Sequence, residues 1–533
     1  MLETGHGVRM RFIVRLLWWA VVFLVVAVVA VLGLVALEAH KGPPLDPWHI
    51  FVPRELGVDS IDRADWKAYV QAEDEIFASV RAEVSQTMAT DGQVPYNRYF
   101  AESPVYPARF ARDWNRSFVI EPMGDVVGAA VLLHGLTDSP YSMRHVARAY
   151  ADAGFVAVGI RLPGHGTVPG GLTTADWESW LAATRLAVRE AQGRAGDARP
   201  LHIIGYSNGG ALAVKYALDA IEDGALARVD RIVLISPMIG VTRFARFAGL
   251  AGLPAMFPAF ARSAWLGTQP EFNPFKYNSF PVNGARQSYR LTDALQTQIE
   301  RMFASGGLDV LPPILTFQSV LDHTVSTRAV ISGLYEYLPA NGSELVLFDV
   351  NRTVKFNPML RPDSASALDR LLPEPPSRFA LTIVANAAVG DTETVAKTIA
   401  AGQTEGVIRP LGIRYPAEIF SLSHVALPFP LDDGLYGLTP DPSEDFGVNL
   451  GNLVARGERG ALVMNLDTIL RVNSNPFFPY MLARIEEGLR KQPGALSGPA
   501  FVKDITTGAR NPKPRLDFEE AFPAGADEDR SYP

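Results

Sequence analysis

Short apolar runs alternate with longer, mixed stretches through the middle of the chain. The runs are rich in valine, isoleucine and leucine, and the stretches that separate most of them are long enough for helices. This alternation is typical of βαβ units, so the sequence predicts an α/β protein with a mostly parallel sheet and helices on both faces. The predicted strands are residues 117–121, 126–133, 155–160, 201–204, 232–235 and 314–317.

Three places depart from the regular alternation. Only a short link separates the first two predicted strands, which favours an antiparallel hairpin there. The pattern lapses over residues 237–311, which we interpret as a lid. It lapses again after a further strand at 343–350, and we interpret residues 351–416 as an irregular insertion.

The N-terminus carries the longest apolar run. Residues 16–37 contain no charged side chain, and a helix needs about 20 such residues to cross a membrane. Arginines precede the run at positions 9, 11 and 15, so the positive-inside rule predicts a single-pass anchor with a cytoplasmic N-terminus. The rest of the chain would then lie outside the cytoplasm, in the periplasm of a bacterium. A cleaved signal peptide is the alternative, but the run is too long for one and no clear A-x-A site follows.

The pattern divides the chain into four parts. Residues 1–41 form the predicted membrane anchor, and residues 42–116 a proline-rich linker followed by a helical extension, with an amphipathic helix expected over about 60–86. Residues 117–492 form the main domain. Residues 493–533 are rich in proline, glycine and charge, which predicts a loosely ordered tail.

Composition excludes several classes of function. The net charge of -8 argues against nucleic-acid binding, which needs a basic face. The chain has no cysteine, so disulfides, thiolate catalysis and cysteine-based metal sites are excluded. No H-E-x-x-H or other metal-ligand spacing occurs, and we therefore expect neither a metal nor an organic cofactor.

The segment LHIIGYSNGGALAV contains the strongest candidate for a nucleophile, Ser207. The pentapeptide G-x-S-x-G is weak by itself, but here an apolar strand precedes it and a helical pattern follows. Glycines at positions 205 and 209 would let the strand and helix approach around a tight turn. The helix would also direct its N-terminal amides toward an oxyanion at the serine. The alternative, a glycine-rich phosphate-binding turn, lacks the G-x-x-x-x-G-K-[ST] pattern.

The acid and base follow from chain order. In an elbow-type hydrolase the acid and then the histidine follow the serine, and only His323 and His424 lie far enough along the chain. Asp322 lies in the turn after the strand that follows the lid, where the acid is expected. Its neighbour His323 cannot easily face both Asp322 and Ser207, so we expect His424 to be the base.

A second segment, VLLHGLTDSPYSM, supplies candidates for the oxyanion hole. His134 and Gly135 end the first parallel strand, and the glycine would permit the turn that follows. We expect the amides of Leu136 and Asn208 to be the two donors to the oxyanion.

Taken in order, LLHGLTDSPYSMR, RLPGHGT, GYSNGG, ISP and LDHTV resemble the α/β-hydrolase superfamily, specifically its monoacylglycerol lipase, lysophospholipase and serine aminopeptidase-like branch. The resemblance implies an α/β-hydrolase fold for residues 117–492, with a cap at 237–311. It also implies a Ser207, Asp322 and His424 triad with Leu136 and Asn208 as oxyanion donors. One departure concerns the last strand, because residues 351–423 separate the predicted strand from a histidine that in most relatives follows directly.

The expected reaction is acyl transfer through a serine ester. The predicted lid carries apolar residues three or four positions apart. A packing face of the lid explains this spacing, and an apolar lid would also suit an acyl chain. We therefore expect a carboxylic-ester hydrolase acting on a small acyl ester or lipid, with the membrane as a partner through the N-terminal helix. An amidase or peptidase of the same branch, or a non-catalytic binding protein with this fold, are the alternatives. The sequence does not indicate the oligomeric state.

Overall fold

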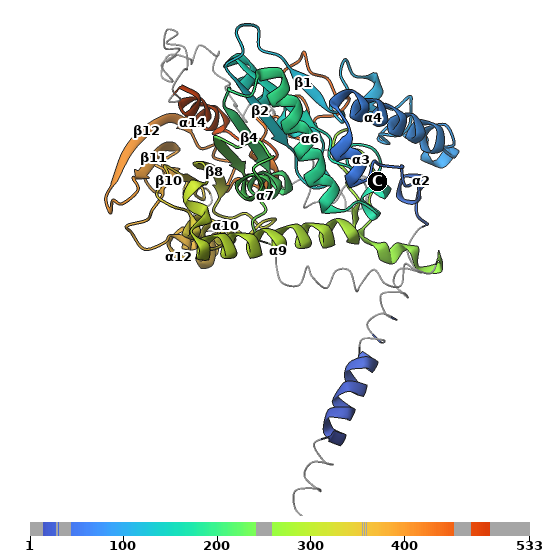
Figure 1. Cartoon of the computed structure of the whole chain (residues 1–533), viewed down its shortest axis with the longest axis horizontal. Helices are drawn as coiled ribbons and strands as arrows, with labels where there is room; N and C mark the ends of the chain where they lie inside the picture. The colour runs from blue at the N-terminus through green and yellow to red at the C-terminus, as the bar shows by residue number, and fades with distance from the viewer. Residues whose placement is uncertain are drawn as a thin grey trace, which may run out of the picture. The chain divides into compact units, whose positions relative to one another are not determined.

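The central feature of the fold is a twisted, mostly parallel sheet (Figure 1). The computed structural model describes residues 14–27, 30, 33, 44–240, 258–353, 355, 358, 360–451 and 471–490. Within them the large sheet has ten strands in the order β1-β3-β2-β4-β5-β8-β9-β10-β11-β12. Pairing is parallel from β3 to β10 and antiparallel at both edges. The strands are β1 (Phe118–Ile120), β2 (Gly128–Leu133), β3 (Phe155–Ile160), β4 (Leu201–Tyr206), β5 (Arg231–Ile235), β8 (Ile314–Ser319), β9 (Glu344–Phe348), β10 (Ala380–Asn386), β11 (Glu393–Ile399) and β12 (Gly406–Arg414).

The central strands are apolar along their whole length because both faces of the sheet are covered. In β2, Ala129, Val131 and Leu133 belong to one hydrophobic cluster, whereas Ala130 and Leu132 belong to another. Side chains alternate between the two faces of a strand, so the two clusters are the two sides of the sheet. This arrangement confirms the predicted α/β fold with two covered faces.

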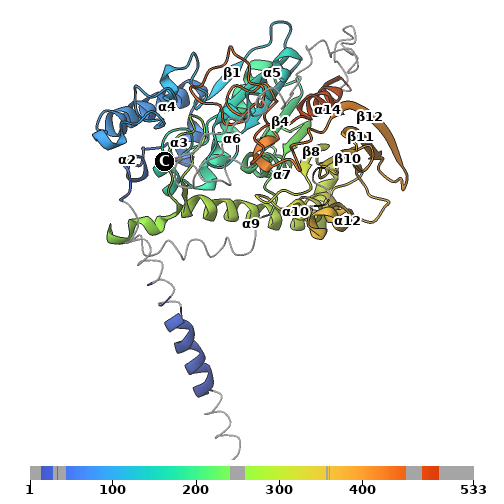
Figure 2. The same cartoon turned by 180° about the vertical axis from the view of Figure 1, so that it is seen from behind.

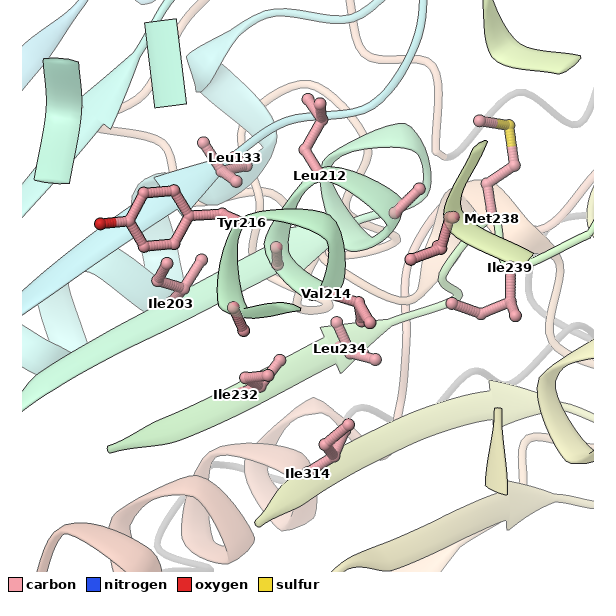
Figure 3. Packing of buried hydrophobic residues seen from close by; sticks show 14 of the residues in the cluster. Leu133, Ile203, Leu212, Val214, Tyr216, Ile232, Leu234, Met238, Ile239 and Ile314 are labelled. Carbon is pink, nitrogen blue, oxygen red and sulfur yellow. The ribbon is translucent and has the colours of Figure 1, made fainter. Parts of the chain in front are cut away.

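Helices from different parts of the chain cover the two faces. Helices α6 (Trp177–Ala195) and α7 (Asn208–Glu222) contribute to the first cluster, and both lie in front of the sheet in Figure 1. Helices α5 (Arg144–Asp152) and α14 (Phe478–Arg490) contribute to the second, on the side seen in Figure 2. Figure 3 shows how Leu212, Val214 and Tyr216 of α7 pack over apolar side chains of the neighbouring strands. This packing fixes the N-terminus of α7 at the end of β4.

The predicted hairpin between the first two strands is wrong in its pairing. Strand β1 is antiparallel, as expected at this edge, but its partner is β3, with Phe118 opposite Gly159. A side chain at position 159 would collide with the Phe118 ring, which lies only 2.4 Å from where a Cβ would be. The glycine therefore lets Phe118 lie across β3, and β2 pairs with β3 and β4 instead.

The segment 351–416, predicted as an irregular insertion, contains three further strands. Strand β10 continues the parallel sheet beside β9, and β11 and β12 extend it as an antiparallel pair. Both ends of the segment meet at Asn351, whose backbone N–H donates to the oxygen of Phe420 at 2.8 Å. The Asn351 side chain also donates to the oxygens of Pro416 and Ile419, at 2.9 and 2.7 Å. The chain thus returns to the end of β9 before it reaches His424.

The extension before the sheet is helical, as predicted, but it is broken into short pieces. Helix α2 (Pro47–Ile50) precedes the helix expected over about 60–86. That helix is divided into α3 (Val58–Arg63) and α4 (Trp66–Val80), the latter continued by a π-helix at Arg81–Ser85, because Asp65 caps a new helix by accepting from the N–H of Ala68 at 2.7 Å. Two glutamates of the extension pair with the buried Arg161 that follows β3. The nitrogen–oxygen distances are 2.8 Å to Glu55 and 3.1 Å to Glu73.

The prediction of an N-terminal transmembrane helix is wrong. Residues 14–27 are helical. Among the described residues, however, no helix has both the length and the apolar character that a membrane span requires. This finding also overturns the expected single-pass topology, the extracytoplasmic placement of the catalytic domain and membrane contact through this helix. The remainder of the predicted span falls outside the described residues, apart from positions 30 and 33.

Two other predicted segments are described only in part or not at all. In the predicted lid, residues 241–257 lie outside the described part. The rest contains the short strands β6 (Trp265–Gly267) and β7 (Phe280–Pro281) and the long helix α9 (Val282–Ser305), which packs on α6 and α7. The predicted tail at 493–533 lies wholly outside the described residues.

Candidate active site

Ser207 occupies a strained turn between β4 and α7. Its backbone angles are φ 53° and ψ -115°, a conformation that a residue with a side chain rarely adopts. The backbone of the serine is held by neighbours on β5 and beyond, because its N–H donates to Ile235 at 3.0 Å and its oxygen accepts from Met238 at 2.9 Å. The turn therefore presents the serine at the carboxyl end of the sheet, and 8% of the residue remains exposed.

The glycines on either side of Ser207 are required by close backbone contacts. A Cβ at Gly205 would lie 2.3 Å from the oxygen of Gly209. A Cβ at Gly209 would lie 2.1 Å from the oxygen of Leu133, on strand β2. Neither contact is sterically possible, so only glycine allows the strand and the helix to meet at this turn.

Asp322 and His424, far apart in the chain, are hydrogen-bonded to each other. Asp322 follows β8, and His424 begins a short 3-10 turn after the chain has returned from β12. The distance from Nδ1 of His424 to Oδ2 of Asp322 is 2.9 Å, and His424 is buried. An ionised aspartate only accepts, so Nδ1 carries the proton and Nε2 is left with a lone pair. This is the tautomer that a general base needs.

Four hydrogen bonds hold the Asp322 carboxylate. Oδ1 accepts from the backbone N–H groups of Thr324 and Val325, at 2.8 and 3.0 Å. Oδ2 accepts from His424 and from Nε2 of the buried Gln318, the latter at 3.1 Å. Burial raises the pKa of Asp322, but His424 and these backbone donors outweigh it and lower the pKa below its ordinary value. The aspartate is therefore ionised at neutral pH.

Tyr206 links the histidine to the serine turn. Its ring lies against the imidazole of His424, with the ring centroids 5.3 Å apart. The carbonyl of Leu422, two residues before His424, accepts a hydrogen bond from the Ser319 hydroxyl at 2.8 Å. Since Tyr206 immediately precedes Ser207, these contacts hold His424 beside the serine turn.

The predicted oxyanion loop lies directly against the serine. A Cβ at Gly135 would lie 3.2 Å from Cβ of Ser207, and Leu136 and Thr137 follow in the loop. Thr137 has a positive φ of 61°, so this loop is strained as well. Asn208, the other predicted donor, is the first residue of α7 and is buried.

His134 supports this loop from beneath. Its Nδ1 lies 2.9 Å from the oxygen of Gly135, and its Nε2 accepts from the N–H of Leu162 at 3.1 Å. Burial lowers the pKa of His134 well below its ordinary value, so the imidazole is neutral. His134 thus bridges the loops that follow β2 and β3 and has a structural role.

Comparison with known proteins shows which sequences this chain resembles. A family of hydrolases described as serine aminopeptidase, S33 (Hydrolase_4) matches residues 124–349. The thermostable monoacylglycerol lipase of Bacillus sp. (strain H-257) is 28% identical over 198 residues, which are 37% of this chain and 70% of the relative. Residues 124–349 thus carry the sequence of an α/β-hydrolase and are similar to a monoacylglycerol lipase.

Two solved structures of lipolytic enzymes also resemble part of this chain. The metagenome-derived lipolytic enzymes LipS and LipT are represented by a chain with 24% identity and a TM-score of 0.35, covering 48% of this chain and 95% of that one. A soluble variant of the monoglyceride lipase from Saccharomyces cerevisiae has 14% identity and a TM-score of 0.33, covering 43% of this chain and 81% of that one.

The structure also shows supporting residues that the sequence analysis did not identify. Gln318 is one, and its position four residues before Asp322, at the end of β8, is the signal that could have indicated it. Asp433 is another, because it accepts hydrogen bonds from Arg144, His145 and Tyr141 and thereby holds the loop after His424. Nothing in the sequence around Asp433 indicates which distant side chains it would meet.

His323, which the sequence analysis set aside as the base, is exposed. Among the described residues, no group of three histidine, aspartate or glutamate side chains is arranged to hold a metal ion.

Proposed function

We infer that this α/β-hydrolase cleaves carboxylic esters through a serine nucleophile, with Ser207, His424 and Asp322 as the catalytic triad. The observation that carries the proposal is the Asp322–His424 hydrogen bond of 2.9 Å beside a serine with a φ of 53°. A strained serine turn and an oriented histidine together are the two parts that acyl transfer needs.

Each side chain has one role in the proposed reaction. His424 Nε2 takes the proton of the Ser207 hydroxyl as the oxygen attacks the ester carbonyl, and later gives it to the departing alcohol. Asp322 keeps the imidazole in the required tautomer and stabilises its positive charge. Water then attacks the acyl-enzyme by the same path in reverse, and the acid is released.

The proposed oxyanion donors are the backbone amides of Leu136 and Asn208. Asn208 is the first residue of α7, so its N–H is one of the helix amides that lack an intrahelical acceptor. The dipole of the helix adds to the stabilisation of a negative oxygen at this point. The strained loop at Gly135 and Thr137 lies against the serine, which supports the Leu136 amide as the second donor.

The substrate that we propose is a small acyl ester or lipid. The lipase name of the Bacillus relative supports an acyl-lipid substrate. The family description also names an aminopeptidase, and an amide or peptide substrate is therefore the second candidate. Esters and aminoacyl p-nitroanilides compared on the same preparation distinguish the two.

The test is hydrolysis of p-nitrophenyl esters of increasing acyl length, with labelling by a fluorophosphonate probe. Ser207→Ala should abolish both. Ser236→Ala is a matched control, because Ser236 also has a positive φ at the end of the neighbouring strand and its buried hydroxyl has no hydrogen-bond partner among the described residues. This control should keep both activities. If neither wild type nor control labels or reacts, the chain is a binding protein with a hydrolase fold.

A further inference from the structure

Two cations near the candidate site have no carboxylate in contact. Other buried arginines are hydrogen-bonded: Arg144 pairs with Asp433 at 2.6 Å, and Arg98 donates to the oxygens of Asn273, Asn115 and Gly166. Lys276 is half-buried, yet within the described part of the chain its ammonium makes neither an ion pair nor a hydrogen bond. Arg471 makes a single side-chain hydrogen bond there, to the hydroxyl of Thr324 at 3.1 Å. Arg471 is exposed, so only the half-buried charge of Lys276 carries a desolvation cost that requires an explanation.

The backbone around Lys276 is fixed against the oxyanion loop. The N–H of the next residue, Tyr277, donates to the oxygen of Thr137 at 2.8 Å. The preceding residue, Phe275, stacks on the buried Tyr141, with ring centroids 4.2 Å apart. Lys276 therefore stands on a rigid segment beside the loop that carries Leu136.

Arg471 is tied to the loop that holds the acid. Its partner Thr324 donates its backbone N–H to Oδ1 of Asp322 at 2.8 Å. The two cations are close enough to influence each other. Burial lowers the pKa of Lys276, and repulsion from Arg471 lowers it further. Burial raises the pKa of Tyr206, the residue before Ser207, and the charge of Arg471 opposes this rise.

Two carboxylates lie near this pair, but among the described residues neither makes an ion pair with Lys276 or Arg471. Asp322 is committed to His424. Asp138 attracts Lys276, but the two are not in contact, and its buried Oδ2 has no hydrogen-bond partner among the described residues. Because neither carboxylate contacts them within the described part of the chain, the ammonium of Lys276 and the guanidinium of Arg471 can still donate hydrogen bonds to an anion that enters the site.

We propose that Lys276 and Arg471 form a subsite for an anionic group, a carboxylate or phosphate, on the alcohol part of the ester substrate. The proposal rests on the proposed ester hydrolysis at Ser207. The alcohol side is indicated because Arg471 is held beside the Asp322–His424 pair, and His424 is the group that protonates the departing alcohol. Charge-assisted hydrogen bonds from both cations would hold the anion.

The test uses esters that differ only in one charge. 3-(Butanoyloxy)benzoate carries a carboxylate on the departing phenol, and 3-(butanoyloxy)benzamide is its neutral counterpart of the same shape. The ratio of their kcat/KM values is measured for wild type, Lys276→Gln, Arg471→Gln and Lys276→Arg. Lys355→Gln is the control, because Lys355 is exposed and pairs with Glu418. Any intrinsic difference between the two esters cancels when the ratio is compared across variants.

We expect wild type to favour the carboxylate. Each glutamine variant should reduce that preference by about tenfold or more, as expected for the loss of a hydrogen bond to a charged group. Neutral-ester hydrolysis should persist, the control should match wild type, and Lys276→Arg should retain the preference. If Lys276→Gln does not fold, Arg471→Gln tests the same ratio independently.

Three results would overturn the subsite. The first is an unchanged ratio in both glutamine variants with active neutral-ester hydrolysis, which leaves the proposed function intact. The second is a preference seen only with phenyl hydrogen succinate over phenyl succinamate, which puts the anion on the acyl side. The third is a wild type that hydrolyses none of these esters, in which case the proposed function fails as well.

Discussion

Asp322→Asn tests the role of the carboxylate most specifically, because the structure determines how an asparagine would sit. Oδ1 of Asp322 accepts from the N–H groups of Thr324 and Val325, at 2.8 and 3.0 Å. An amide at this position must direct its oxygen to those two donors. Its NH2 group then faces His424 and Gln318, where the carboxylate oxygen was.

The consequence is the wrong tautomer of His424. With an NH2 group opposite, Nδ1 becomes an acceptor and the proton moves to Nε2, which can no longer take the proton of Ser207. Gln318 can accommodate the change by rotating, because its buried Oε1 has no hydrogen-bond partner among the described residues. The variant should therefore fold while kcat/KM falls by about three to four orders of magnitude, as a tautomer change costs in other serine hydrolases.

The assay is p-nitrophenyl butyrate hydrolysis, with thermal unfolding as the check on folding. Asp363→Asn is the control, because Asp363 is an exposed aspartate that pairs with Arg370. We expect the control to match wild type in rate. An Asp322→Asn variant that keeps its rate within about tenfold of wild type would refute the assignment of Asp322 as the acid.

Four further substitutions test what stabilises the fold. Gly209→Ala should lower the unfolding free energy by several kcal/mol, beyond the about 1–3 typical of overpacking, since its Cβ would lie 2.1 Å from a backbone oxygen. Gly193→Ala should instead stabilise helix α6 by about 0.5–1 kcal/mol, because no atom lies within 4 Å of where its Cβ would be. Urea unfolding measures the unfolding free energy of both glycine variants. Arg161→Met should lower the unfolding free energy by about 3–5 kcal/mol in the same assay, because it removes the ion-pair partner of the buried Glu73. A decrease below about 1 kcal/mol would contradict this reasoning. Burial raises the pKa of Asp433, but its arginine and histidine partners lower it overall, so the carboxylate stabilises the fold above about pH 4 and less as pH falls. Asp433→Asn should be less stable than wild type at pH 7, and the difference should shrink below about pH 4 in thermal unfolding at each pH.

The central strands and the serine turn could be predicted because their determinants are local. Apolar runs such as that of β4, followed by glycines at 205 and 209, allow only one arrangement of strand, turn and helix. The order of serine, acid and histidine then left few candidates, and Asp322 and His424 do lie within hydrogen-bonding distance. Their catalytic roles remain predictions.

What the sequence could not indicate depends on contacts between distant segments. The pairing of β1 with β3 depends on Phe118 lying across Gly159, which no local pattern shows. The strands within 351–416 alternate weakly, because β12 is an edge strand with mostly exposed side chains. The apolar run at 16–37 has the composition of a membrane span, but among the described residues no helix has the length and apolar character that a span requires.

The most direct test of the account is fluorophosphonate labelling of the full chain, followed by mass-spectrometric mapping of the modified residue. The account predicts one adduct, on Ser207, lost in Ser207→Ala and kept in Ser236→Ala. It also predicts that Asp322→Asn labels far more slowly than wild type. An adduct on another serine, or labelling that survives Ser207→Ala, would contradict the assignment of Ser207 as the nucleophile.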